Sequence, residues 1–196
     1  MISLADTSKS FVQRLNVNIT RARRIALFFF FLAVFFVAMS VGAFASLSAS
    51  DAQAISNNIQ SVRNQPLLSR FETVVLNDGG LCLLFFIPGV GQVLLVYASY
   101  QTGVSIAALA ITDSVSRVTE LLNVLFFPTA LLDGIVFGLA ASEGFIFLLS
   151  IINKRYRAES KRFIITIIVC LAVLVVSEVI LVLAYGLTQS PTTIIP

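Results

Sequence analysis

The chain of 196 residues is 58% hydrophobic and only 12% charged, with a formal net charge of +3. A soluble domain ordinarily carries about 25% charged residues, so this composition favours an integral membrane protein whose apolar exterior is solvated by lipid. The sequence contains no histidine, which removes the commonest metal ligand and the usual general base at neutral pH.

Residues 1–24 form a polar and basic leader in which Phe11, Leu15 and Ile19 recur every four residues. A helix here would carry one apolar stripe and one basic face, and would lie on the cytoplasmic membrane interface near anionic headgroups. The alternative is a disordered leader that only sets topology. The basic residues expected at the headgroups lie in this leader and after the fourth apolar segment: Arg21, Arg23, Arg24, Lys154, Arg155, Arg157, Lys161 and Arg162.

Five apolar segments predict an all-α transmembrane bundle that forms one domain over residues 25–187. A hydrocarbon core of about 30 Å needs roughly 17–25 apolar residues per helix. Residues 43–45 have the small-x-small shape of a signal-peptide cleavage site, but the preceding apolar run is too long for a signal peptide, which predicts an uncleaved anchor. The predicted spans are 25–45, 71–87, 91–111, 128–152 and 163–187, the basic segment 153–162 is expected to be a short loop, and 188–196 is a tail.

Two polar connections are predicted to hold short amphipathic helices on the membrane surface. In residues 46–70, Ser50 or Asp51 is the expected N-cap and Pro66 ends the helix. Residues 112–127 carry a helical apolar stripe with the charged residues off it, and the following proline is suited to begin the fourth span.

The second and third segments read as a helical hairpin broken at Pro88, Gly89 and Gly91. Proline removes a backbone donor and glycine permits positive φ, so the chain turns back sharply here. Two alternatives stay open, because residues 71–87 either span the bilayer or re-enter it. Five true crossings place both basic clusters on one side, which the positive-inside rule assigns to the cytoplasm, with the C-terminus outside.

Four acids lie in or near the apolar segments: Asp78, Asp133, Glu143 and Glu178. An ionised carboxylate at bilayer depth costs at least ~2.5–3.5 kcal/mol, so each is a candidate functional residue. They indicate a proton or cation path, or a polar network that locks helices together. The alternative is helix capping at wet ends, above all for the two aspartates.

The sequence shows no Ser–His pair, no cluster of metal ligands and no phosphate-binding glycine loop. We therefore predict a protein without catalytic activity, bound cofactor or metal. Cys82 and Cys170 lie inside apolar runs and are expected to be small buried side chains.

Three stretches, residues 76–91, 97–110 and 127–144, resemble the stage II sporulation protein M family of integral membrane proteins. Asn77, the pair Thr102-Gly103, and Pro128 with Asp133 take the places of the family's short patterns. Phe127 and Asp133 stand where that family often has histidine and glutamate. The resemblance covers roughly residues 24–187 and implies a membrane-embedded scaffold that recruits partners, without implying sporulation.

Two functions follow as hypotheses. The first is a scaffold or assembly subunit that meets other membrane proteins or a second copy of itself through small residues on its helices, and binds no nucleic acid. The alternative is a small permease or channel component that uses the intramembrane acids, since interrupted spans often line binding sites. A cavity shared by Glu143 and Glu178 would favour the permease, and local hydrogen bonds of these acids would favour the scaffold.

Overall fold

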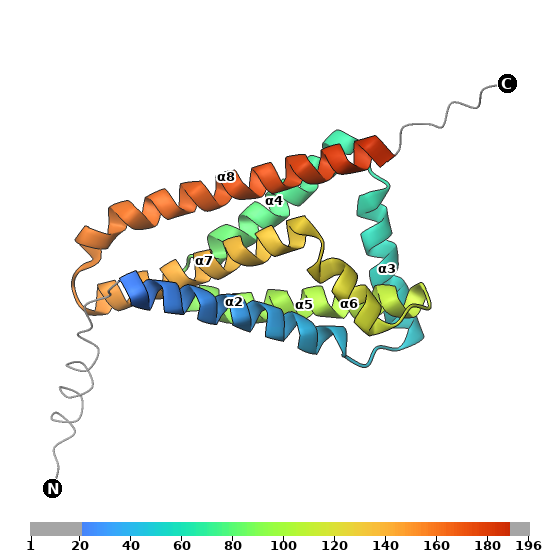
Figure 1. The fold of residues 1–196 in the computed structure, drawn as a ribbon, viewed down its shortest axis with the longest axis horizontal. Coiled ribbons are helices and arrows are strands. Elements are labelled where there is room, and N and C mark those ends of the chain that lie inside the picture. Colours follow the sequence, from blue (N-terminus) through green and yellow to red (C-terminus); the bar gives the residue numbers. More distant parts are fainter. Residues whose placement is uncertain (1–20, 189–196) are drawn as a thin grey trace, which may run out of the picture.

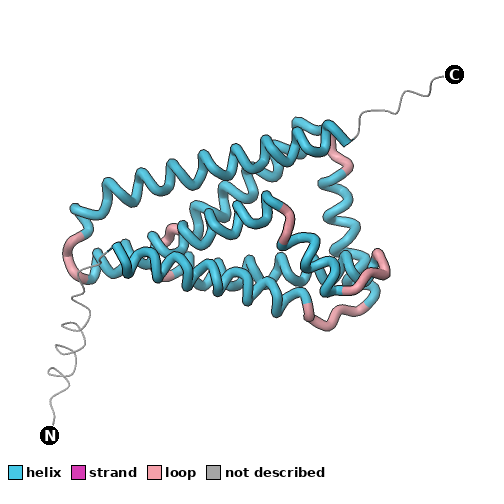
Figure 2. Tube along the Cα trace, in the orientation of Figure 1, coloured by secondary structure: helices cyan, strands magenta, loops and turns pink. Residues whose placement is uncertain are grey.

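The computed structural model describes residues 21–188, and this part of the chain is helical without any strand (Figures 1 and 2). The predicted all-α class is confirmed. The proposed interfacial helix before residue 21 and the tail after 188 lie outside the described residues. Seven helices follow one another: α2 (Arg21–Ala43), α3 (Ala49–Arg63), α4 (Leu67–Phe85), α5 (Val90–Thr112), α6 (Arg117–Leu125), α7 (Pro128–Ile152) and α8 (Tyr156–Thr188).

The long helices α2, α4, α5, α7 and α8 run along the long axis of the molecule, while α3 stands across one end and the short α6 lies near that end (Figure 1). The opposite end collects the start of α2, the α4–α5 turn and the α7–α8 turn. Four stretches are long and apolar enough to cross a membrane, namely α2, α5, α7 and the part of α8 over Glu159–Ile180. They are compatible with a multi-pass membrane protein. The fifth long helix, α4, carries three charged residues in nineteen.

The closest contact between helices joins α2 and α5. A Cβ atom added to Gly103 would lie 2.0 Å from the carbonyl oxygen of Met39, and one added to Gly42 would lie 2.1 Å from that of Tyr100. The two backbones therefore touch directly, which small residues permit in helices that pack inside a membrane. The same stretch of α5 buries Ala107 completely.

The α4–α5 hairpin turns at the residues that suit a turn. Helix α4 ends at Phe85 and α5 begins at Val90. Pro88 lies between them, and Gly89 adopts φ +82°, a left-handed conformation that favours glycine. Gly91 lies inside the first turn of α5, where an added Cβ would come within 2.1 Å of the Phe85 carbonyl oxygen. The chain thus reverses too tightly to accept a side chain at that position.

Two local expectations were wrong. The N-cap of α3 is Ser48 instead of Ser50 or Asp51, because the Ser48 Oγ accepts a hydrogen bond from the Asp51 amide at 3.1 Å and the helix starts at Ala49. The basic segment 153–162, expected as a loop, mostly forms the first turns of α8, which begins at Tyr156. That segment contains no glycine or proline to stop a helix, so the turn is confined to a few residues.

Candidate functional site

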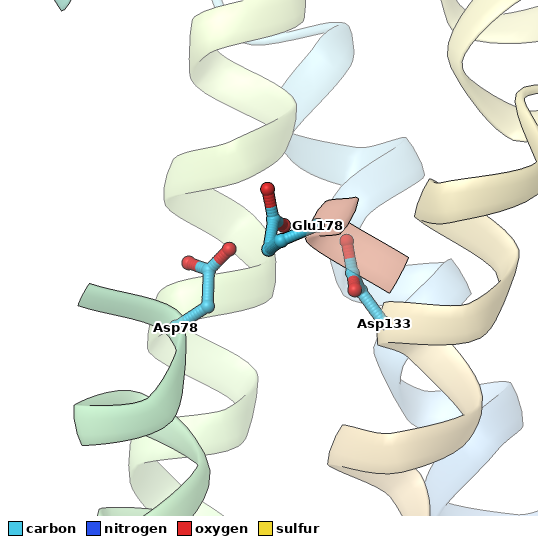
Figure 3. Close-up of side chains that lie close together, drawn as sticks. All are labelled: Asp78, Asp133 and Glu178. Atoms are coloured by element: carbon cyan, nitrogen blue, oxygen red, sulfur yellow. The ribbon is translucent and has the colours of Figure 1, made fainter. Parts of the chain in front are cut away.

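Three of the four predicted acids come together inside the bundle. Asp78 comes from α4, Asp133 from α7 and Glu178 from α8, and one carboxylate oxygen of each lies within 4.8 Å of the other two. Figure 3 shows the Glu178 side chain between the two aspartates. Glu178 is only 3% exposed, and both aspartates are half-buried. We call these three residues the acid cluster.

Glycine helps to place two members of the acid cluster. Gly134, next to Asp133, lies so close to α2 that an added Cβ would come within 3.1 Å of the rings of Phe35 and Phe36. Since consecutive helical residues point about 100° apart, this contact leaves Asp133 on another side of α7, toward α4 and α8. On α4, Gly79 follows Asp78 and has only a Leu171 methyl within 4 Å of an added Cβ, so α4 and α8 lie close at this level.

A cavity of about 230 Å³ opens beside the acid cluster. Asp78 and Asp133 line it together with the polar side chains of Asn77, Ser99 and Thr102. The Asn77 amide donates a hydrogen bond to Asp78 Oδ1 at 2.9 Å. The cavity therefore offers oxygen atoms to a bound species inside an otherwise apolar core.

Two polar atoms at the acid cluster are buried without a hydrogen-bond partner among residues 21–188. They are Asp133 Oδ1 and the hydroxyl oxygen of Ser177, which is fully buried and within reach of the Asp133 carboxyl but not in normal hydrogen-bonding geometry with it. Unsatisfied buried polar atoms are rare in folded proteins and call for an explanation, such as a bound ion or water.

Electrostatic repulsion limits what the acid cluster can hold. Two ionised carboxylates 4.8 Å apart repel each other by about 3.5 kcal/mol at an effective dielectric constant of 20. Arg70 on α4 acts electrostatically on Glu178 and offsets part of this repulsion. Three ionised carboxylates nevertheless carry more negative charge than one arginine balances, so the site is suited to take up protons or a cation.

The fourth acid, Glu143 on α7, lies elsewhere and is bonded to Arg24 of α2. Arg24 Nη1 donates to the Glu143 carboxylate oxygens at 3.0 and 3.1 Å, and Arg24 Nη2 pairs with Glu159 in the first turn of α8. Arg24 is 7% exposed and Glu143 is 6% exposed. Arg24 thus lies inside the protein instead of at the headgroups, whereas Arg21 and Arg23 are exposed as expected.

Sequence analysis missed this ion pair because 119 positions separate its partners. An arginine at the edge of a basic leader is indistinguishable by sequence from its neighbours. The sequence suggested that a cavity shared by Glu143 and Glu178 would favour a permease, and that separate hydrogen bonds would favour a scaffold. The result is divided, because Glu143 is bonded to Arg24 while Glu178 lies with the two aspartates. The basic residues of the second cluster, which are Lys154, Arg155, Arg157, Lys161 and Arg162, are exposed.

The two cysteines lie on the same helices as Asp78 and Glu178, outside the acid cluster. Cys82 follows Asp78 by one helical turn, Cys170 precedes Glu178 by about two turns, and both are buried free thiols. The two thiols interact with each other, and Cys170 Sγ also lies 4.0 Å from the Val136 carbonyl oxygen. Cys82 and Cys170 therefore tie the packing of α4 to that of α8.

An open groove of about 390 Å³ runs between α4 and α5. It shares Leu81, Ala98 and Thr102 with the cavity at the acid cluster. Gln101 and Asn77 are exposed on these two helices. The groove therefore lies directly beside the cavity, and its lining is mostly apolar. We call the exposed polar residues Asn77, Gln101 and Thr102 the polar strip on α4 and α5.

The chain matches no protein-family model, no curated protein and no solved structure. The resemblance to the stage II sporulation protein M family stays a prediction.

Proposed function

We propose that this protein is a five-span membrane protein that binds a cation at Asp78, Asp133 and Glu178 and moves it across the bilayer, as a small permease or channel component. The observation that carries the proposal is the meeting of these three carboxylates from three different helices. Acids inside transmembrane bundles are expensive, and they commonly mark proton relays and ion pathways.

The arrangement of the helices supports five spans, although α4 is less apolar than the other long helices. Helix α4 packs against α8, α5 and α7, most extensively against α8, and connects the end that carries α3 to the end that carries the α4–α5 turn (Figure 1). If α5 and α8 cross the bilayer, α4 lies beside them over a similar depth. Its backbone is helical from Leu67 to Phe85, so its hydrogen bonds are satisfied within the helix, as lipid requires.

The charge distribution supports an orientation with the N-terminus in the cytoplasm and the C-terminus outside. Arg21 and Arg23 at the start of α2 and the basic residues at the start of α8 are exposed at one end of the molecule. The positive-inside rule assigns such an end to the cytoplasm.

The groove between α4 and α5 supports access to the site. Because the groove and the cavity share Leu81, Ala98 and Thr102, an ion that enters along α4 and α5 meets Asn77 and Asp78 first. Glu178, which is almost fully buried, lies beyond them. Protonation of a cluster carboxylate would weaken its hold on a bound cation and so release the ion.

The test is flux through purified protein reconstituted in liposomes, with protons, Na⁺, K⁺, Mg²⁺ and Mn²⁺ as the probes. We expect at least one of these fluxes to fall to the level of empty liposomes in each of Asp78→Asn, Asp133→Asn and Glu178→Gln. Glu72→Gln is the matched control, because Glu72 is an exposed acid of the same helix α4 outside the acid cluster. The proposal would be refuted if the wild type carried no flux, or if flux were unchanged in all three variants of the acid cluster.

A scaffold is the second candidate, and the polar strip on α4 and α5 favours it. Asn77 and Gln101 each donate one hydrogen bond on their own helix, to Asp78 and Tyr97. Lipid offers nothing to their remaining amide groups, whereas a neighbouring protein does. Gly80 on α4 also has open space where a side chain would be, which leaves room for a close partner helix. Wild-type protein that carries no flux but co-purifies with membrane subunits, and loses them in Asn77→Leu and Gln101→Leu, would favour this role.

A further inference from the structure

We infer that the acid cluster is a binding site for a hard divalent cation, of the class of Mg²⁺, Mn²⁺ and Ca²⁺. This inference rests on the proposed function and names the kind of ion that it handles. The ligands are the carboxylates of Asp78, Asp133 and Glu178, with the Ser177 hydroxyl beside them.

The donor atoms select the class of metal. All three carboxylates offer oxygen, and the chain has no histidine nitrogen to add. Mg²⁺, Mn²⁺ and Ca²⁺ prefer carboxylate, carbonyl and water oxygens, whereas zinc and copper prefer imidazole and thiolate.

The spacing of the oxygens fits one ion. Three atoms that all lie within 4.8 Å of one another are no more than about 2.8 Å from a common centre. Ca²⁺ binds oxygen at about 2.3–2.6 Å and Mg²⁺ at about 2.0–2.1 Å, so small side-chain rotations bring all three carboxylates onto a single ion. The adjoining cavity of about 230 Å³ has room for the water molecules that these ions retain.

A second observation, independent of the acids, points to a ligand. The Ser177 hydroxyl has no exposed surface and lies within reach of the Asp133 carboxyl, but it makes no hydrogen bond of normal geometry to that carboxyl or to any other described residue. A buried hydroxyl is normally hydrogen-bonded. A hydrated cation at the acid cluster would supply that partner, either directly or through one of its water molecules, and would also satisfy Asp133 Oδ1.

The charge balance distinguishes a divalent ion from a monovalent one. Three ionised carboxylates carry three negative charges, and Arg70, which acts on Glu178, contributes one positive charge. A divalent ion offsets two of the three negative charges of the cluster and Na⁺ or K⁺ only one, so a monovalent ion leaves more uncompensated negative charge in an apolar core. An uncompensated buried charge is strongly disfavoured.

The experiment measures Mn²⁺ binding to the purified full-length protein by electron paramagnetic resonance, through loss of the free-ion signal. We expect one Mn²⁺ per chain, displaced by Mg²⁺ or Ca²⁺ and not by NaCl at equal ionic strength. Asp133→Asn should abolish binding, and Glu72→Gln should leave it unchanged. Ser177→Ala keeps all three carboxylates and should weaken Mn²⁺ binding by about 10-fold or more, as loss of a supporting group at a metal site does.

If Asp133→Asn fails to fold, Ser177→Ala still tests the inference, because it removes only one oxygen atom from the site. The inference would be overturned if the wild type bound no Mn²⁺, or if Asp133→Asn and Ser177→Ala both bound Mn²⁺ as tightly as the wild type. If Mn²⁺ does not bind but protons or Na⁺ still cross the liposome membrane and this flux is lost in the cluster variants, the proposed function is supported and the divalent site is refuted. If Mn²⁺ binds as expected but no ion crosses, the site stands and transport falls.

Discussion

The contact between α2 and α5 leaves no room for a side chain at Gly103. In Gly103→Ala, the new Cβ would lie 2.0 Å from the Met39 carbonyl oxygen and 2.7 Å from the Ala43 amide nitrogen. Real Cβ contacts are essentially never shorter than 3.0 Å, so the helices must separate by about 1 Å. Both opposing atoms belong to the backbone of α2 and cannot rotate away.

The expected destabilisation is about 2–3 kcal/mol, at the upper end of the usual cost of overpacking. Alanine has a better helix propensity than glycine and adds at most ~1 kcal/mol to the free energy of unfolding, so the substitution remains destabilising. For a chain of this size, a loss of 2–3 kcal/mol lowers the melting temperature by roughly 4–12 °C.

The two buried cysteines supply the assay, because a thiol-reactive fluorogenic dye reports their exposure as the protein unfolds in detergent. Melting curves of wild type and variants are compared at one heating rate, since unfolding of such proteins is often irreversible. Gly80→Ala is the matched control, as a Cβ at Gly80 would meet nothing within 4 Å. Equal melting temperatures for Gly103→Ala and Gly80→Ala would show that α2 and α5 do not touch as described.

Two further predictions concern the interior polar groups. Arg24→Gln should destabilise the protein by about 3–5 kcal/mol, because it leaves Glu143 buried without its partner, and the double variant Arg24→Gln/Glu143→Gln should recover part of that loss in the same melting assay. Arg21→Gln, an exposed arginine one turn earlier, should stay within about 0.5 kcal/mol of the wild type, and a similar loss in both arginine variants would contradict the buried pair. Mild oxidation of membranes should join Cys82 to Cys170 and give a disulfide-linked pair of peptides from α4 and α8 in mass spectrometry; cysteines that stay free under oxidant would argue against that packing.

Hydrophobic length predicted the long helices well, because an apolar run bounded by polar residues leaves few alternatives. Helix α7 occupies 128–152, the bounds of a predicted span, and α5 differs from its predicted segment by one residue at each end. Helix ends set by side-chain chemistry were harder to place. The N-cap of α3 moved to Ser48 because several serines compete for it, and α8 extends into a basic segment that nothing in its sequence stops.

The acid cluster could be predicted only as separate candidates. Periodicity places Asp78, Asp133 and Glu178 on three helices, but which helices are neighbours depends on packing that no local pattern encodes. The close approach of α7 to α2 at Gly134 and of α4 to α8 near Gly79 brings the three together. For the same reason, sequence could not separate Glu143 from the other acids or assign Arg24 to it.

The polarity of α4 has a consequence for biosynthesis. During synthesis α4 emerges well before α8, the helix against which it packs more extensively than against any other. Asp78 and its neighbours would then face lipid without the partners that surround them in the finished bundle, and the translocon releases such a weakly apolar helix poorly. If α4 is a span, as we propose, it would enter the bilayer late, held beside the insertion machinery until α7 and α8 have been synthesised.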